Sequence, residues 1–237
     1  CAILIPPADK PMGWSAADAV AEGFDVASFL EDGPRQPAVA QLHLQDLSEP
    51  IEDIDYATEN GVALAFTHHF GQDVRFCVAW SKWLNWNGKR WEMDGGLHVK
   101  HLARLVCCSA ANFTSKPHVQ ARLTSAGAFA SIERIVRADP QHHVRVEQLD
   151  ANEWLLNTPG GIVDLQTGML GPHVPERHMT RITSATPGGD CPVWRGFLVD
   201  VTGGDEEMQA YLQRMVGYCL TGDMSTHALF FLHGTGA

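Results

Sequence analysis

The sequence contains no apolar run of the roughly 20 residues that a membrane-spanning helix requires. Its first residues lack the charged, then apolar, then small-residue order of a secretory signal peptide. Charged residues make up only 19% of the chain and hydrophobic ones 45%, with no repeat or low-complexity tract. This composition predicts a folded protein of the cytoplasm, with no membrane partner, and argues against a disordered chain.

Motifs for several kinds of chemistry are also missing. None of the six cysteines forms a C-x-x-C pair, which favours free, reduced thiols over disulfides. His98 and His101 fit one helix face, but no third ligand stands at a suitable spacing, so no metal site is predicted. The sequence contains no G-x-S-x-G motif and no recognisable Ser-His-Asp or Cys-His pattern. No catalytic residue is therefore predicted.

The negative charge is concentrated at the front of the chain. The whole sequence carries a formal charge of −11, and residues 1–60 hold twelve acids against Lys10 and Arg35. Residues 61–237 are almost balanced, with sixteen acids and fifteen Lys or Arg. A nearly neutral domain still presents local basic surfaces, so the overall acidity does not exclude nucleic-acid binding.

Helical and hairpin patterns together predict an α+β fold, in which helices pack around short antiparallel hairpins. Asn87-Gly88 stands between the apolar runs Val74–Trp86 and Lys89–Met93, a strong hairpin signal. Counting outward from that turn places Trp80, Leu84 and Trp86 on one face, with Trp91 and Met93 opposite them. A second hairpin is expected around Pro159-Gly160-Gly161. Apolar spacing predicts helices over Thr58–Phe70, Leu97–Asn112, Ala121–Ala138, Val193–Val201 and Asp205–Thr221.

The last residues resemble the start of a phosphate-binding loop. An apolar segment, His227–His233, is expected to form a central strand, and it leads directly into Gly234, Thr235, Gly236 and Ala237. Glycines in such a loop let successive backbone N–H groups converge on a phosphate. A G-x-G after a strand is a weak signal by itself, because an ordinary turn has the same pattern.

Several separated motifs, in order, strengthen that interpretation, and together they resemble the phage/plasmid primase family. The resemblance is to its poxvirus-type domain that precedes a superfamily III helicase, and it covers about residues 57–237. The motifs are Leu155–Gly168, Pro172–Arg181, Trp194–Leu198, Tyr211–Gly222 and Phe230–Ala237.

The resemblance implies four parts. Residues 1–32 resemble the end of a primase domain of the Toprim type, although Ser15 stands where that family has an Asp. Residues 33–56, rich in Pro, Gln, Asp and Glu, are expected to form a linker. Residues 57–225 would connect primase to helicase, and residues 226–237 would begin the helicase ATPase domain with the first strand of a P-loop fold. Since the chain opens on Cys1 without an initiator Met and stops partway into the expected loop, truncation at both ends is expected.

The resemblance also implies a function in DNA replication. The intact protein would be a primase and ATP-dependent helicase that uses ATP and Mg²⁺, assembles as a hexameric ring, and binds single-stranded or origin DNA. Gly234 to Ala237 would be a partial Walker A motif, and this chain alone would not hydrolyse ATP.

Two groups of basic residues are candidates for contacting DNA. Lys82, Lys89 and Arg90 accompany a Trp-rich hairpin whose rings either stack on bases or, as we favour, form a core. A second group carries Arg122, Arg134 and Arg137, together with Lys116, Arg145, His142 and His143. A solvated helix face explains the second group equally well.

Two other functional classes stay open. The chain fits a non-catalytic DNA-binding or protein-docking module from a truncated gene. It also fits, less well, a virion structural protein with a coincidental glycine-rich end.

Overall fold

The computed structural model describes residues 2–4, 22, 35–37 and 47–232. The chain divides into two compact units: residues 1–71 with 97–141, and residues 72–96 with 142–237. In the first unit, strands β1 (Ala2–Leu4) and β2 (Arg35–Pro37) pair antiparallel, so β2 falls inside the segment expected to be a linker. Of residues 1–32, expected to be the end of a primase domain, the structure describes only 2–4 and 22. The mixed α+β class is confirmed.

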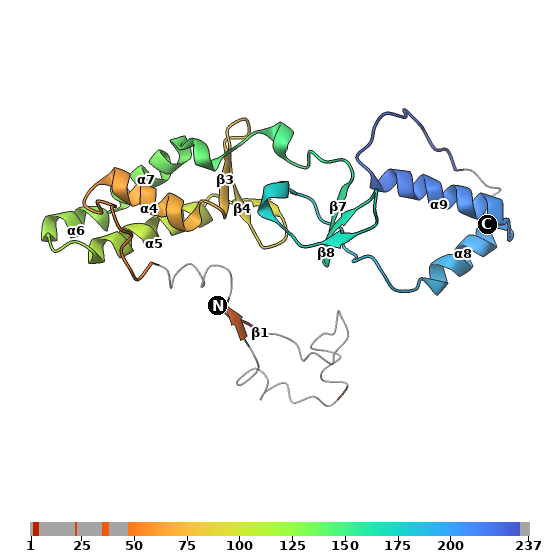
Figure 1. Cartoon of the computed structure of the whole chain (residues 1–237), viewed down its shortest axis with the longest axis horizontal. Coiled ribbons are helices and arrows are strands. Elements are labelled where there is room, and N and C mark those ends of the chain that lie inside the picture. The colour runs from red at the N-terminus through yellow and green to blue at the C-terminus, as the bar shows by residue number, and fades with distance from the viewer. Residues whose placement is uncertain (1, 5–21, 23–34, 38–46, 233–237) are drawn as a thin grey trace. The chain divides into compact units, whose positions relative to one another are not determined.

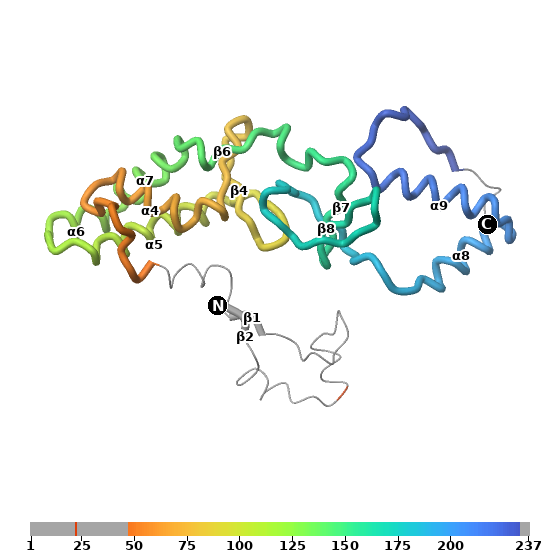
Figure 2. The backbone as a smooth tube through the Cα atoms, viewed as in Figure 1, coloured from red at the N-terminus to blue at the C-terminus, as the bar shows by residue number. Residues whose placement is uncertain are grey.

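Among the described residues of the first unit, four helices follow β2: α4 (Glu59–Phe70), α5 (His98–Asn112), α6 (Pro117–Leu123) and α7 (Ala126–Ala138). Helices α4, α5 and α7 pack against one another, as Figures 1 and 2 show. Their shared core is fully buried and is formed by Val62, Phe66, Phe70, Val99, Val106, Ile132 and Val136. Each such side chain contributes about 1.5–3 kcal/mol when it leaves water.

Short polar side chains set where these helices begin. Thr58 accepts a hydrogen bond from the Gly61 N–H at 3.0 Å, which caps α4, and Ser125 accepts one from the Ala128 N–H at 3.2 Å, which caps α7. Gly61 is required at its position, because a Cβ there would lie 2.0 Å from the Asp55 carbonyl oxygen. The Ser125 cap also explains one wrong prediction. The expected single helix Ala121–Ala138 is divided at Thr124 and Ser125 into α6 and α7.

The second unit contains a four-stranded sheet in the order β5-β4-β3-β6. Its strands are β3 (Val74–Cys77), β4 (Lys82–Trp86), β5 (Trp91–Met93) and β6 (His143–Val144), and β6 runs parallel to β3. The predicted hairpin is confirmed, with Trp86 opposite Trp91 and Leu84 opposite Met93. The expected single run Val74–Trp86 is wrong, however, since the chain turns between Cys77 and Lys82 with Ser81 at a φ of 52°.

A three-stranded antiparallel sheet follows, formed by β7 (Leu155–Thr158), β8 (Gly161–Asp164) and β9 (Leu170–Gly171). The predicted turn lies between β7 and β8 at Pro159 and Gly160. Short 3₁₀ helices lie at Pro140–His142 immediately before β6, at Val146–Gln148 between β6 and β7, and at Pro175–Arg177 after β9.

Two amphipathic helices follow, α8 (Pro192–Thr202) and α9 (Glu206–Leu220). Asp205 caps α9 by accepting a hydrogen bond from the Met208 N–H at 3.0 Å, and Glu206 and Glu207 lie at the positive end of the helix dipole. Neither helix buries a side chain among the described residues. Residues 227–232 lie outside any strand, so the predicted final strand is not confirmed.

Candidate nucleic-acid interface

The three helices α5, α6 and α7 carry a concentration of positive charge. Residues 97–138 contain one acid, Glu133, and six Lys or Arg, which gives a formal charge of +5. The other residues hold eleven Lys or Arg against twenty-seven acids, a charge of −16. The six cations are Lys100, Arg104, Lys116, Arg122, Arg134 and Arg137. We call residues 97–138 the basic helical segment.

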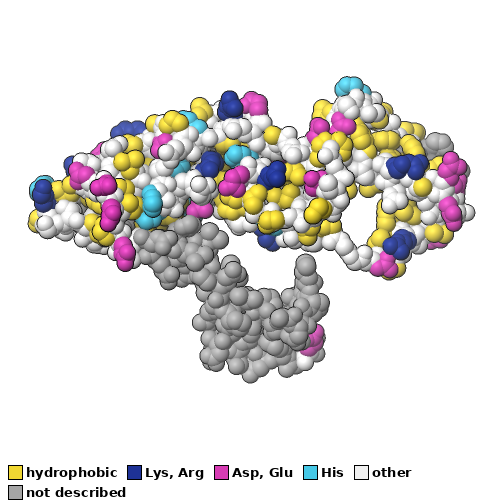
Figure 3. Space-filling view, viewed as in Figure 1, with side chains coloured by type: hydrophobic (Ala, Val, Ile, Leu, Met, Phe, Trp, Pro, Cys, Tyr) yellow, Lys and Arg dark blue, Asp and Glu magenta, His cyan; other side chains and the backbone are white. Residues whose placement is uncertain are grey.

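Helical periodicity directs these cations outward. The buried face of α5 includes Val99, Ala103 and Val106, so that Lys100, His101 and Arg104 lie on its exposed face. On α7, Ile132 and Val136 point into the core while Arg134 and Arg137 are exposed. Figure 3 shows Lys or Arg and His side chains together on the surface around α6. The core packing of the unit therefore also arranges its basic surface.

The predicted DNA-contacting residues fall in different units. Arg122, Arg134 and Arg137 belong to the basic helical segment, and the Arg122 guanidinium donates a hydrogen bond to the Ala57 carbonyl. Lys82 and Lys89 are exposed in the second unit, on β4 and in the hairpin turn. Arg90 forms an ion pair with Glu92 at 2.7 Å, which balances its charge locally.

The tryptophans of the hairpin mainly form a core. Trp91 is 1% exposed, and its indole Nε1 donates a hydrogen bond to the Pro175 carbonyl at 2.9 Å. Trp83 is buried with Phe76 at 5.1 Å and with His142 at 6.0 Å between ring centroids. Trp83 and Trp91 are therefore closed to base stacking. The favoured core interpretation is confirmed for Trp91 but not for Trp80, which is 38% exposed in the turn after β3.

One residue of the second predicted basic group lies in the interior. His142 is fully buried, and its Nδ1 lies 3.4 Å from the Val74 carbonyl oxygen. It therefore cannot contact DNA, and the prediction that placed it on that surface is wrong. His143 and Arg145 are exposed beside it in the second unit.

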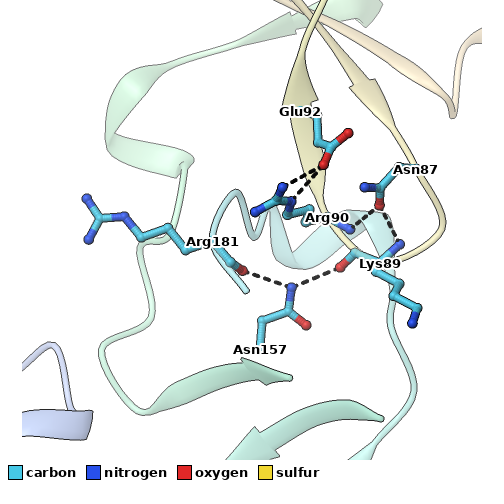
Figure 4. A network of polar contacts seen from close by, with 6 residues as sticks. All are labelled: Asn87, Lys89, Arg90, Glu92, Asn157 and Arg181. Atoms are coloured by element: carbon cyan, nitrogen blue, oxygen red, sulfur yellow. Dashed lines mark hydrogen bonds and ion pairs between the residues drawn. The ribbon is translucent and has the colours of Figure 1, made fainter. Parts of the chain in front are cut away.

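A buried amide holds the hairpin turn in place. Asn157 Nδ2 donates to the Lys89 carbonyl at 2.9 Å and to the Arg181 carbonyl at 3.0 Å, while Asn87 Oδ1 accepts from the Lys89 and Arg90 N–H groups (Figure 4). The two carbonyl acceptors fix which amide atom is nitrogen. The Lys89 backbone is thus committed to structure, while its ammonium extends to solvent.

Burial also lowers the pKa values of two basic side chains in the second unit, Arg75 and His178. The Arg75 guanidinium lies 5.2 Å from the centroid of the Trp91 ring, and burial lowers its pKa against the opposing effects of Glu176 and Asp73. Burial and then the Arg75 charge lower the pKa of His178, which adopts a left-handed conformation at a φ of 50°. This cluster joins strand β3 to the segment around residue 178.

Five cysteines lie among the described residues. Burial, followed by Cys108 and Glu59, raises the pKa of the Cys107 thiol to about 12. Among the described cysteines, Cys77, Cys107, Cys108, Cys191 and Cys219 are free thiols, and Cys191 and Cys219 are exposed. Within the described ranges no three His, Cys, Asp or Glu side chains gather as metal ligands would, and no helix there is long and apolar enough to span a membrane.

The predicted phosphate loop, Gly234 to Ala237, lies outside the described residues. Sequence reasoning overlooked Lys100, His101 and Arg104, which the structure adds to the basic surface. The signal was present, because residues 95–132 contain no Asp or Glu at all. Averaging charge over residues 61–237 concealed it.

A comparison with models of known protein families identifies the family of this chain. Residues 63–203, more than half of its length, match the model for domains described as D5 N terminal like. The chain belongs to this family. It is thereby a member of the primase–helicase proteins, which work in DNA replication. A search of curated proteins found no match. The matched region begins within α4 and ends just after α8, so it includes the whole basic helical segment.

Proposed function

We propose that this chain is the connecting part of a phage or plasmid DNA primase–helicase and that it holds DNA through its basic helical segment. The observation that carries the proposal is the charge contrast, +5 over residues 97–138 against −16 elsewhere, within a primase–helicase family domain. Phosphates attract such a surface regardless of sequence, and their release of counterions supplies most of the non-specific affinity.

The motor is the second part of the proposal. Gly234, Thr235, Gly236 and Ala237 would open a Walker A loop of a superfamily III helicase, which would bind ATP and Mg²⁺. The protein would act in the bacterial cytoplasm as a hexameric ring, with single-stranded or origin DNA as its partner. The motif resemblance over residues 155–237 supports this part.

One observation favours a second candidate, a non-catalytic docking module. Helices α8 and α9 expose Trp194, Phe197, Tyr211 and Val216, each between 45% and 51%, and Figure 3 shows hydrophobic side chains on their surface. Apolar surface of this kind is typical of contacts with another domain or protein.

An ATPase assay separates the two candidates. The chain would be extended through the flanking coding sequence, and hydrolysis measured with and without single-stranded DNA. We expect DNA-stimulated hydrolysis that is lost when the lysine following the loop glycines becomes Ala. A folded hexamer without ATPase activity would contradict the motor and leave the docking module as the better account.

A further inference from the structure

The exposed faces of α5 and α7 enclose a groove of about 430 Å³ in the first unit. Lys100, His101 and Arg104 line it from α5, and Phe129, Ala130 and Glu133 line it from α7. All three α5 residues are exposed, whereas Phe129 is half-buried. The groove therefore has a basic wall and a wall with an aromatic ring beside a small residue.

The spacing of the α5 residues places the cations along one edge. Lys100 and Arg104 are four residues apart, so they lie on the same helix face about 6 Å apart along the axis. His101 lies between them, three residues before Arg104. No acid occurs in α5, and Glu133 is the single carboxylate at the groove.

We propose that this groove binds single-stranded DNA, with an unpaired base against Phe129 and the adjacent phosphates on Lys100 and Arg104. A positive track beside an aromatic ring is the combination with which proteins bind single strands without sequence preference. Charge complementarity over the basic helical segment supports a polyanion as the occupant. The inference rests on the proposed function, since it assigns where the replicated DNA is held.

Two alternative occupants fit the groove less well. In a duplex the bases are stacked and paired, so a base reaches Phe129 only after it is unstacked. An acidic peptide would satisfy Lys100 and Arg104 but offers no planar ring for Phe129. Single-stranded DNA uses both walls at once.

The test compares fluorescent oligo-dT with a duplex of equal length, bound by the full 237-residue chain. The wild-type protein should bind the single strand more tightly. Phe129→Ala should lower that affinity roughly 5- to 150-fold and leave duplex binding almost unchanged. Phe129→Leu, which keeps an apolar side chain in the groove, should preserve the far-ultraviolet circular dichroism spectrum and still weaken single-strand binding.

A cation pair and a matched control complete the experiment. Lys100→Gln with Arg104→Gln should reduce the slope of log affinity against log salt by about 1.4, the value for two phosphates of a single strand. Lys82→Gln with Lys89→Gln removes two equally exposed cations of the second unit and should leave binding to the groove intact.

Each other outcome has a distinct meaning. Wild-type binding that is unaffected by the Phe129 and α5 variants, or stronger binding of poly-glutamate than of oligo-dT, would overturn the groove while the proposed function stands. Absence of any DNA binding by the wild-type chain would overturn the groove and the proposed DNA contact together. ATPase activity of the extended protein would still report on the motor separately.

Discussion

Helices α5 and α9 each have fifteen residues and an amphipathic pattern, yet they differ in what covers their apolar faces. Helix α5 packs against α4 and α7 and buries seven residues. Helix α9 contacts α8 and buries none among the described residues. An apolar stripe therefore indicates that a helix has a face to bury, but it does not say which partner buries it.

The charges of the two regions differ in the same direction. The basic helical segment has a charge of +5, whereas residues 192–221 hold four acids against Arg195 and Arg214, a charge of −2. In the basic helical segment the apolar helix faces are buried and the exposed faces carry cations. The other region presents apolar surface and a slight negative charge. This contrast supports the proposals of DNA contact for the first region and of protein contact for the second.

Truncating one phenylalanine in each region gives the largest expected contrast. Phe66 on α4 is fully buried beside Phe70, with ring centroids 5.3 Å apart, and Phe197 on α8 is 51% exposed. Phe66→Ala should cost about 3–5 kcal/mol of unfolding free energy, because it removes buried area and leaves a cavity. Phe197→Ala should change it by about 0.5 kcal/mol or less. Urea denaturation measures both, and an equal cost would mean that α8 is covered in solution.

Thiol labelling tests the same contrast at single residues. Cys107 is buried in α5 with its pKa raised to about 12, so the thiol stays protonated between pH 6 and pH 9 and the reactive thiolate is scarce. Cys191 and Cys219 are exposed at α8 and α9. Maleimide should label those two at least about a hundredfold faster than Cys107, as read by mass spectrometry after a time course. Comparable rates would contradict the closed packing of α5.

Removing one helix cap in each region should give the smallest difference between them. Ser125→Ala should lower the free energy of unfolding by about 1 kcal/mol, because the Ala128 N–H loses its acceptor at the start of a packed helix. Asp205→Ala removes the equivalent bond to the Met208 N–H on α9. There we expect fraying of the first turn, seen as faster amide hydrogen exchange, with little change in global stability. An equal loss of global unfolding free energy in both variants would contradict the expected difference between α7 and α9.

Much of the fold could be predicted from local patterns. The Asn87-Gly88 signal located the hairpin between β4 and β5, and Thr58 and Asp205 marked where α4 and α9 begin. The errors came from competing local signals. The apolar pattern continued past Ser125, whose cap starts a new helix, and past Ser81, where the chain turns. Periodicity cannot detect an interruption made by one capping or left-handed residue.

The candidate site was less predictable. Charge averaged over residues 61–237 concealed the basic helical segment, and the groove depends on the approach of α5 to α7, which are separated in the chain by α6. Lys100 and Phe129 are 29 positions apart, so no local pattern joins them. Conversely, the buried His142 looked like a surface residue because it stands next to His143 and Arg145.

The central claim is that the basic helical segment, and not the hairpin of the second unit, holds the phosphates. The most direct measurement is the salt dependence of oligo-dT binding by the full chain, with two pairs of exposed cations removed in turn. Lys116→Gln with Arg134→Gln should reduce the slope of log affinity against log salt by about 1.4, and Lys82→Gln with Lys89→Gln should leave it unchanged. A slope that falls only when Lys82 and Lys89 are removed would contradict the account.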